Sequence, residues 1–182
     1  MNWMKKVAVA LVCLLPLGLQ AAKVDTLQVK SPSMDKSIEV VVVSPDVAAT
    51  KACPVIYLLH GYGGNARTWV GIKPDLPKIA DEKGIFFVCP DGKNTWYWDS
   101  PLNADVRYET FISNELVKYV DSHYKTVADR KGRAITGLSM GGHGAMWNGL
   151  HHSDVFSAAG STSGGVDIRP FPKNWEMSVQ IG

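Results

Sequence analysis

Residues 134–141, Ala-Ile-Thr-Gly-Leu-Ser-Met-Gly, place a Gly-x-Ser-x-Gly motif directly after a short apolar run. The run predicts a buried strand that ends at Leu138, and the residues from about Gly141 onward predict a helix. A serine on such a tight turn has crowded neighbours, which favours glycine on both sides and pushes the hydroxyl above the edge of the sheet. The motif therefore predicts a nucleophile at Ser139. The alternative is a structural serine in a glycine-rich turn.

A second glycine-rich turn follows an earlier apolar run at Val55–Leu59. Its sequence is His60-Gly61-Tyr62-Gly63-Gly64. Such a turn leaves backbone N–H groups facing the space above the serine, and the first N–H groups of the helix after the serine face the same space. We therefore expect the backbone amides of Tyr62 and Met140 to form an oxyanion hole. A glycine-rich loop without a catalytic part is the alternative.

Strand and helix signals alternate along the rest of the chain. Two β-rich runs separated by a turn-like stretch, Val24–Val29 and Ile38–Val43, predict an antiparallel hairpin. Short apolar runs predict buried parallel strands, and apolar residues at helical spacing predict crossover helices. The predicted strands are 55–59, 85–89, 134–138 and 156–160, and the predicted helices are 77–83, 108–124 and one that begins near residue 141. This order indicates an α/β fold with a mostly parallel sheet.

The motifs and their spacing resemble the esterase D-like esterases, a family that includes S-formylglutathione hydrolases, feruloyl and tributyrin esterases, and mycolyltransferases. The likeness runs from about residue 24 to the end of the chain, and its matching stretches are 57–64, 90–92, 108–112, 115–116 and 135–142. The resemblance implies an α/β-hydrolase fold and a carboxylic ester hydrolase that works through an acyl-enzyme on Ser139. The alternatives are an acyltransferase built on the same serine and a non-catalytic carbohydrate-binding module. The sequence shows no metal-ligand cluster or nucleotide-binding loop, so we expect no metal site and no cofactor.

In the fold that the resemblance implies, a catalytic acid and then a histidine follow the serine along the chain. Only 43 residues follow Ser139, and the resemblance leads us to expect roughly 80 to 100 more. We therefore expect the esterase domain at 22–182 to be incomplete at its C-terminal end, with a sheet truncated after about six strands. We expect the chain alone to be a poor catalyst, because its five histidines are predicted to be structural or on the surface. They are His60, His123, His143, His151 and His152.

The first 21 residues have the pattern of a secretory signal peptide. Lys5 and Lys6 precede a 13-residue apolar run, and Leu19-Gln20-Ala21 offers a small-residue cleavage site. The run is shorter than the ~20 residues of a membrane span, and the alternative is an uncleaved anchor helix. Removal of this segment takes two lysines from 19 basic residues and leaves 17 against 17 acidic ones. We expect a near-neutral secreted or periplasmic protein without a membrane span or a nucleic-acid partner.

Three adjacent aromatic residues, Trp96, Tyr97 and Trp98, follow the strand that is predicted to end at Cys89. Loops after the carboxyl ends of parallel strands line the ligand crevice. We therefore expect Trp96 and Trp98, together with Trp69, to stack on a sugar ring or an aromatic acyl group. Together with export, this suggests an ester attached to a glycan, such as an acetyl or feruloyl ester, as the substrate, with a small-molecule ester as the other candidate. The alternative is that these side chains cap the core beneath a long loop.

Overall fold

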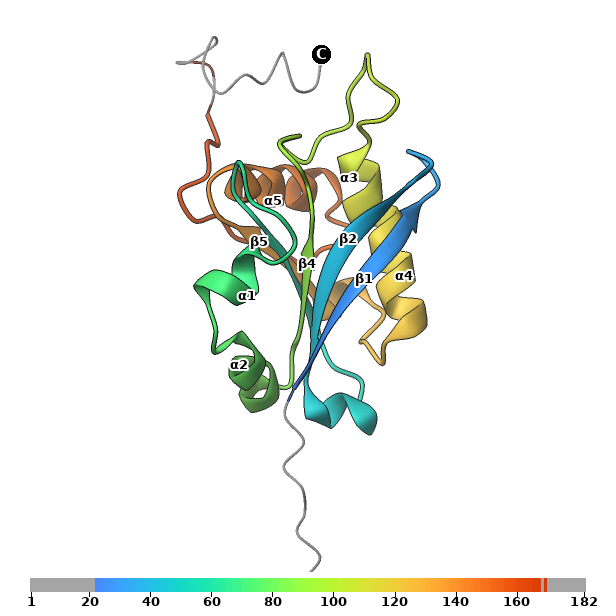
Figure 1. Ribbon diagram of the computed structural model, residues 1–182, viewed down its shortest axis with the longest axis vertical. Helices are drawn as coiled ribbons and strands as arrows, with labels where there is room; N and C mark the ends of the chain where they lie inside the picture. The colour runs from blue at the N-terminus through green and yellow to red at the C-terminus, as the bar shows by residue number, and fades with distance from the viewer. Residues whose placement is uncertain (1–21, 168, 170–182) are drawn as a thin grey trace, which may run out of the picture.

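The computed structural model describes residues 22–167 and 169, so the predicted signal peptide at 1–21 lies outside the described residues. A six-stranded sheet of order β1-β2-β4-β3-β5-β6 forms the centre of the molecule (Figure 1). Strand β2 pairs antiparallel with β1 and with β4. Strand β3 pairs parallel with β4 and with β5, and β5 pairs parallel with β6. The predicted hairpin and the mixed α/β sheet are thus confirmed. The strands are β1 (Lys23–Ser31), β2 (Lys36–Ser44), β3 (Val55–Leu59), β4 (Phe86–Pro90), β5 (Arg133–Gly137) and β6 (Ala158–Ala159).

Helices cover both faces of this sheet (Figure 1). One face packs against side chains of α4 and α5, and the other against α1 and α2. In β2, Val40 and Val42 contact the first group, whereas Val41 and Val43 contact the second, because successive side chains of a strand point to opposite faces. The strand is apolar throughout because both its faces are buried. The helices are η1 (Asp46–Ala49), α1 (Thr68–Ile72), α2 (Leu76–Lys83), α3 (Tyr108–Thr110), η2 (Phe111–Glu115), α4 (Leu116–His123), η3 (Arg130–Gly132) and α5 (Met140–His151).

The helix predicted over 108–124 is confirmed, but it is not regular throughout. Between α3 and α4 the chain forms a π-helical turn, η2. More residues per turn bring successive side chains closer in direction, and Phe111, Ile112 and Ser113 are all buried here. Glu115 at the end of the turn accepts hydrogen bonds from the Ser31 hydroxyl (2.6 Å) and from the Ser33 amide (2.8 Å), which attaches the helix to the β1–β2 hairpin. The helix predicted over 77–83 is confirmed as α2.

The strand predicted over 156–160 is shorter than expected. Phe156 is buried and its ring packs edge-on against Tyr57, with centroids 5.7 Å apart, so its side chain belongs to the core. The ladder to β5 nevertheless continues beyond β6, because the Gly160 amide donates to Ile135 O (2.9 Å) and the Thr162 amide donates to Gly137 O (2.9 Å). The segment after β6 therefore runs alongside the end of β5.

Cys53 and Cys89 are free thiols in separate clusters of the core. Burial raises the pKa of the Cys53 thiol, and it raises the pKa of the Cys89 thiol to about 12. Thiols with raised pKa values are weak nucleophiles at neutral pH, because the thiolate is the reactive form. Both cysteines therefore act as small apolar core residues.

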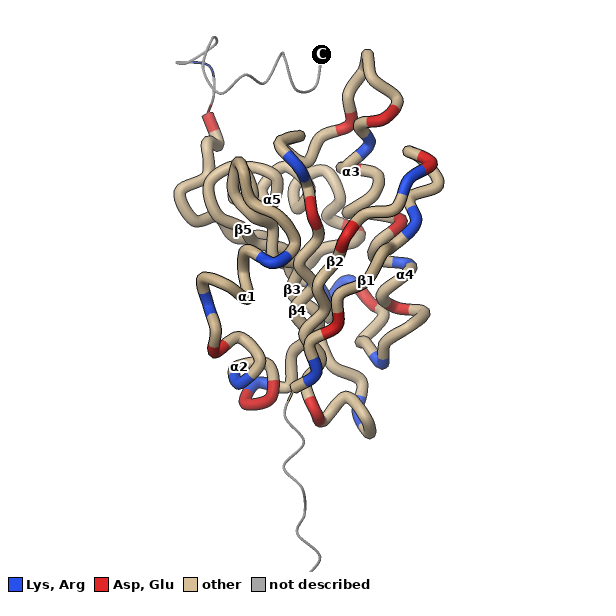
Figure 2. Tube along the Cα trace, viewed as in Figure 1, with Lys and Arg blue, Asp and Glu red and all other residues tan. Residues whose placement is uncertain are grey.

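Basic and acidic residues are interspersed along the trace (Figure 2). Near the adjoining ends of β2 and β4 they form ion pairs, Arg67 with Glu39 and Lys93 with Asp91. Among the helices of residues 22–167, none is long and apolar enough to cross a membrane.

Candidate active site

Ser139 lies between β5 and α5, on the turn that the sequence predicts. Its φ of +51° and ψ of −118° form a strained conformation for a residue with a side chain, and the residue is exposed. A Cβ on Gly137 would lie 2.4 Å from the carbonyl carbon of Gly141, and a Cβ on Gly141 would lie 2.2 Å from Leu59 O. Both flanking positions therefore require glycine. The result is a strained turn that presents an exposed serine at the carboxyl end of β5.

The backbone groups of Ser139 are both hydrogen-bonded. Its amide donates to Thr162 O (2.8 Å), and its carbonyl accepts from the His143 amide (3.0 Å). Met140 is the first residue of α5, and the first N–H groups of a helix have no acceptor within the helix and lie at its positive end. An oxyanion beside Ser139 would therefore accept a hydrogen bond from the Met140 amide, because the Ser139 amide already donates to Thr162 O. The donor role of Met140 stays a prediction.

The turn after β3 lies against the turn that carries Ser139. A Cβ on Gly61 would be 2.7 Å from Leu138 Cδ1 and 3.4 Å from the Cβ of Ser139. The Gly64 amide closes the turn on Gly61 O (3.0 Å). The Gly63 amide donates to Asn94 Oδ1 (2.8 Å), which connects the turn to the loop after β4. Tyr62, whose amide is the second predicted oxyanion donor, therefore belongs to a turn that is fixed beside Ser139.

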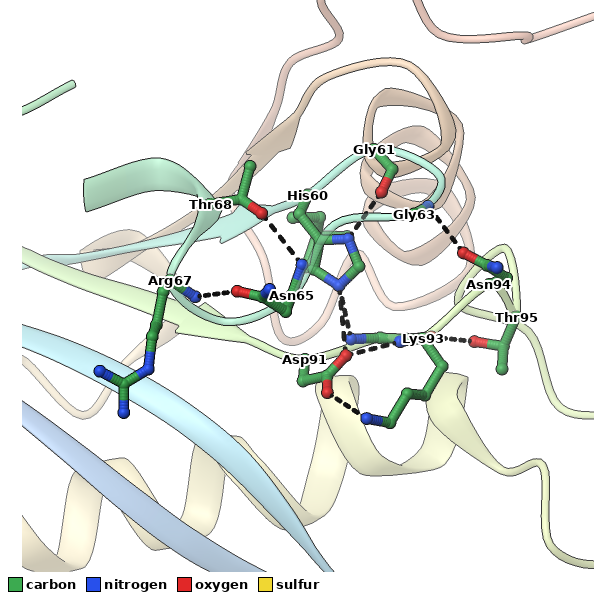
Figure 3. A network of polar contacts seen from close by, with 12 residues as sticks. His60, Gly61, Gly63, Asn65, Arg67, Thr68, Asp91, Lys93, Asn94 and Thr95 are labelled. Atoms are coloured by element: carbon green, nitrogen blue, oxygen red, sulfur yellow. Dashed lines mark hydrogen bonds and ion pairs between the residues drawn. The ribbon is translucent and has the colours of Figure 1, made fainter. Parts of the chain in front are cut away.

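His60 holds this turn from below (Figure 3). The Gly92 amide donates to His60 Nε2 (2.9 Å), so Nδ1 carries the ring proton and donates to Gly61 O (2.7 Å). The Tyr97 hydroxyl donates to the His60 carbonyl (3.0 Å). His60 is fully buried, and both its ring nitrogens are occupied. It therefore braces the β3 and β4 turns and does not serve as a base for Ser139.

Replacing His60 with Phe is expected to lower the free energy of unfolding by about 2 to 4 kcal/mol, because it leaves the buried Gly92 amide without its acceptor and removes the Nδ1 donor from Gly61. Urea unfolding measures the change. The control is His151→Phe, at an exposed position of α5. A loss below about 0.5 kcal/mol for His60→Phe would show that the network contributes little.

Asp91 follows β4 and is 5% exposed. Its Oδ1 accepts from the Lys93 amide (2.9 Å), and its Oδ2 lies 2.6 Å from Lys93 Nζ. Asp91 Oδ1 is also 3.4 Å from His60 Nε2, but that nitrogen already accepts from Gly92, so neutral His60 has no proton to donate there. Burial raises the pKa of Asp91, yet the amide and the ammonium group of Lys93 favour the carboxylate, and the pKa is lowered to about 2.

This depressed pKa predicts acid sensitivity. In the unfolded chain the Asp91 carboxyl binds a proton near pH 3.8, but in the folded chain near pH 2. Its stabilising contribution is therefore complete above about pH 4 and is lost as the pH falls toward 2, by about 2 kcal/mol. Asp91→Asn should flatten the fall in unfolding free energy across this range, measured by urea unfolding at several pH values. Identical pH profiles of the two proteins would contradict this assignment.

The three predicted substrate-binding tryptophans pack closely on neighbouring elements. Trp96 is 4% exposed, and its ring centroid lies 5.3 Å from that of His143. Trp98 is half-buried, 4.9 Å from the same imidazole and 5.4 Å from Trp147. Trp69 donates its indole N–H to Leu59 O (3.0 Å). The burial of Trp96 leaves little of its ring for a ligand, whereas a binding role for Trp98 and Trp69 stays a prediction.

Each of the five histidine side chains is hydrogen-bonded to a group other than Ser139. The two at the end of α5 bond to Trp147 and Glu109, and the others bond within the turns already described, at the end of α4, or to the segment after β6. The acceptors or partners are Gly61 and Gly92 for His60, Tyr119 and Ser122 for His123, Gly165 for His143, Trp147 for His151, and Glu109 for His152. Among the described residues, therefore, no histidine side chain is hydrogen-bonded to Ser139.

Sequence reasoning missed several residues that hold the two turns in place. Asp91 lies in a stretch that matches the family, but no role was expected for it. Asn94 follows the same strand, and polar residues just after the carboxyl end of a strand are the signal that points to such positions. Thr162 acts through its backbone carbonyl, which leaves no trace in side-chain chemistry. Within residues 22–167 and 169, no group of three or more His, Cys, Asp or Glu side chains is placed to hold a metal ion.

Comparison with known proteins identifies relatives among esterases and acyltransferases. An esterase of Mycobacterium tuberculosis (strain H37Rv) is 33% identical over 123 residues, which cover 64% of this chain and 26% of the relative. The diacylglycerol acyltransferase/mycolyltransferase Ag85A of Mycobacterium leprae is 32% identical over 158 residues, which cover 79% of this chain and 44% of the relative. The chain thus spans a quarter to a half of the length of these two relatives.

A solved S-formylglutathione hydrolase from Agrobacterium tumefaciens superposes with a TM-score of 0.75 at 22% identity, over 87% of this chain and 63% of the other. This likeness establishes the α/β-hydrolase fold. Residues 31–179 match the family described as "Putative esterase". The match covers most of the chain and includes both glycine-rich turns, and the chain belongs to the putative esterase family.

Proposed function

We propose that Ser139 is the nucleophile of a secreted carboxylic ester hydrolase that works through an acyl-enzyme. The observation that carries the proposal is the strained, exposed Ser139 at the first turn of α5. The family of the chain and the turn at 61–64 beside the serine support the same chemistry. Secretion rests on the pattern of residues 1–21.

In the proposed reaction, Ser139 Oγ attacks the acyl carbon of the ester and loses its proton to a base. The oxyanion that forms accepts hydrogen bonds from the amides of Tyr62 and Met140. The bond from the acyl carbon to the alkoxy oxygen then breaks, and the alcohol leaves with a proton. Water attacks the acyl-serine in the same manner, releasing the carboxylic acid and restoring the hydroxyl of Ser139.

No described histidine is hydrogen-bonded to Ser139, so we expect slow acylation when the base must come from these residues alone. p-Nitrophenyl acetate suits this chain, because its leaving group is stable as an anion and needs no proton donor. Ser139-dependent release of nitrophenol tests the proposed nucleophile.

We propose a glycan-linked ester as the substrate class, with Trp98 and Trp69 as the residues that contact the sugar or the acyl group. The test measures acetate released from acetylated xylo-oligosaccharides beside p-nitrophenyl acetate. Slower turnover of the oligosaccharides than of the simple ester is expected, because a sugar alkoxide needs a proton to leave. Oligosaccharides that are neither hydrolysed nor inhibit hydrolysis of the simple ester would overturn the glycan assignment, whereas turnover of neither ester would count against the esterase.

A second candidate is acyl transfer to an alcohol, which the likeness to a mycolyltransferase favours. It differs only in the acceptor of the acyl group. Adding a sugar acceptor during hydrolysis of p-nitrophenyl acetate separates the two, because a transferase would form acetylated sugar at the expense of acetate. Sugar binding that survives Ser139→Ala, with no acylation of Ser139, would instead favour a non-catalytic module.

A further inference from the structure

His143 lies one helical turn beyond Ser139 and contacts both the nucleophile turn and the segment after β6. Its backbone amide donates to Ser139 O (3.0 Å). Its side chain is 7% exposed, and Nδ1 lies 2.6 Å from Gly165 O in the segment that follows β6. A carbonyl oxygen only accepts, so Nδ1 carries the proton and donates it. One residue thus connects the nucleophile turn to residues 160–166.

The segment 160–166 is in turn hydrogen-bonded to the nucleophile. Thr162 O accepts from the Ser139 amide, and the Thr162 amide donates to Gly137 O. The contact with α5 is close, because a Cβ on Gly164 would lie 2.7 Å from both Gly142 C and His143 N. Ser161, Thr162 and Ser163 are exposed, so burial of their side chains contributes little to holding the segment. The bond from His143 to Gly165 is the side-chain bond that joins the segment to α5.

The imidazole of His143 is itself fixed. Its ring packs edge-on against Trp96 and Trp98, with centroids 5.3 and 4.9 Å away. Burial lowers the pKa of His143, although the bond to Gly165 opposes this, and the ring is therefore neutral at pH 7. A rigid neutral ring with its proton on Nδ1 suits a donor whose direction must not change.

From this geometry we infer that His143 is a positioning residue for the reaction of Ser139, which holds segment 160–166 against the nucleophile turn. The inference rests on the proposed function of Ser139. Loss of the bond to Gly165 would loosen Thr162, release the Ser139 amide from its acceptor and allow the strained turn to relax. The hydroxyl would then be less well aligned for attack, which lowers the rate of acylation more than substrate affinity.

The test compares His143→Leu and His143→Asn in the purified 182-residue chain. Leu has no donor, whereas the amide nitrogen of Asn occupies the position of Nδ1 and restores one. Two quantities are measured: amide hydrogen exchange at Ser139 and Thr162, and the rate at which p-nitrophenyl acetate acylates Ser139. We expect His143→Leu to speed amide exchange at Ser139 and Thr162 at least tenfold and to slow acylation at least tenfold, with little change in KM. His143→Asn should recover most of the wild-type exchange rate and most of the wild-type acylation rate.

The matched control is His151→Leu, because His151 Nδ1 also bonds a backbone carbonyl, but within its own helix (2.9 Å to Trp147 O). It should change neither quantity. Unchanged exchange at Ser139 in His143→Leu, or an Asn variant that behaves like the Leu variant, would overturn the inference. If the wild-type chain acquires no acyl group at all, the proposed function fails, and the exchange rates still decide whether His143 holds the segment.

Discussion

Ser139→Ala is expected to reduce hydrolysis of p-nitrophenyl acetate to the uncatalysed rate. The substitution removes the one oxygen that attacks the ester and leaves the turn intact, because Ala can replace Ser at the same backbone angles with no new atoms. Loss of a serine nucleophile costs up to about 10⁶-fold in an enzyme with its full catalytic machinery. In this chain the fall is limited by the wild-type rate, so the comparison is made on nitrophenol release per mole of protein after subtraction of the buffer rate.

Ser163→Ala is the control for this substitution. Ser163 is also exposed and also has a positive φ, +54°, so the control matches Ser139 in side-chain chemistry and in the sign of φ. It should retain the wild-type rate. Equal nitrophenol release by the wild type and Ser139→Ala would contradict a serine nucleophile at this turn.

Gly141→Ala is expected to lower the free energy of unfolding by about 3 to 5 kcal/mol. The new Cβ would lie 2.2 Å from Leu59 O and 2.6 Å from His60 O, and these are backbone atoms that cannot rotate away. Leu59 O also accepts from the Leu138 amide (3.2 Å) and from the Trp69 indole (3.0 Å). Any shift that relieves the clash therefore disturbs the contact between β3 and the nucleophile turn.

Gly71→Ala is the matched control, because a Cβ on Gly71 meets no atom within 4 Å. Gly71 lies in α1, where Ala is favoured over Gly by up to about 1 kcal/mol. Chemical denaturation should show a lower free energy of unfolding than the wild type for Gly141→Ala and a higher one for Gly71→Ala. A stability of Gly141→Ala within about 0.5 kcal/mol of the wild type would contradict the close approach of α5 to β3.

The sequence predicts most of the fold because local chemistry and tertiary packing agree over most of the chain. Val40 to Val43 form an unbroken apolar run, and β2 is buried on both faces. Gly137 and Gly141 flank the serine, and the structure leaves no room for a Cβ at either position. At these positions the residue type follows directly from the packing, because burial on both faces requires apolar residues and close backbone contact requires glycine.

Other features depend on contacts that the local sequence does not record. The π-helical turn ends at Glu115, whose partners Ser31 and Ser33 lie more than 80 residues away. The burial of Trp96 depends on its packing against His143 in α5. Thr162 holds the Ser139 amide through a backbone carbonyl, and every residue has such a carbonyl. Periodicity and motif spacing report which face a residue occupies, but not its distant partners.

The most direct test of the account is covalent labelling of the purified chain with a fluorophosphonate, followed by intact mass and peptide mapping. The reagent phosphonylates an accessible serine oxygen, its fluoride leaves without a proton, and no water is needed to complete a second step, so labelling over a long incubation is expected even when acylation is slow. We predict one phosphonyl group for each chain, located on Ser139 and absent from Ser139→Ala. An unlabelled wild-type chain, or a label on a different residue, would contradict Ser139 as the nucleophile.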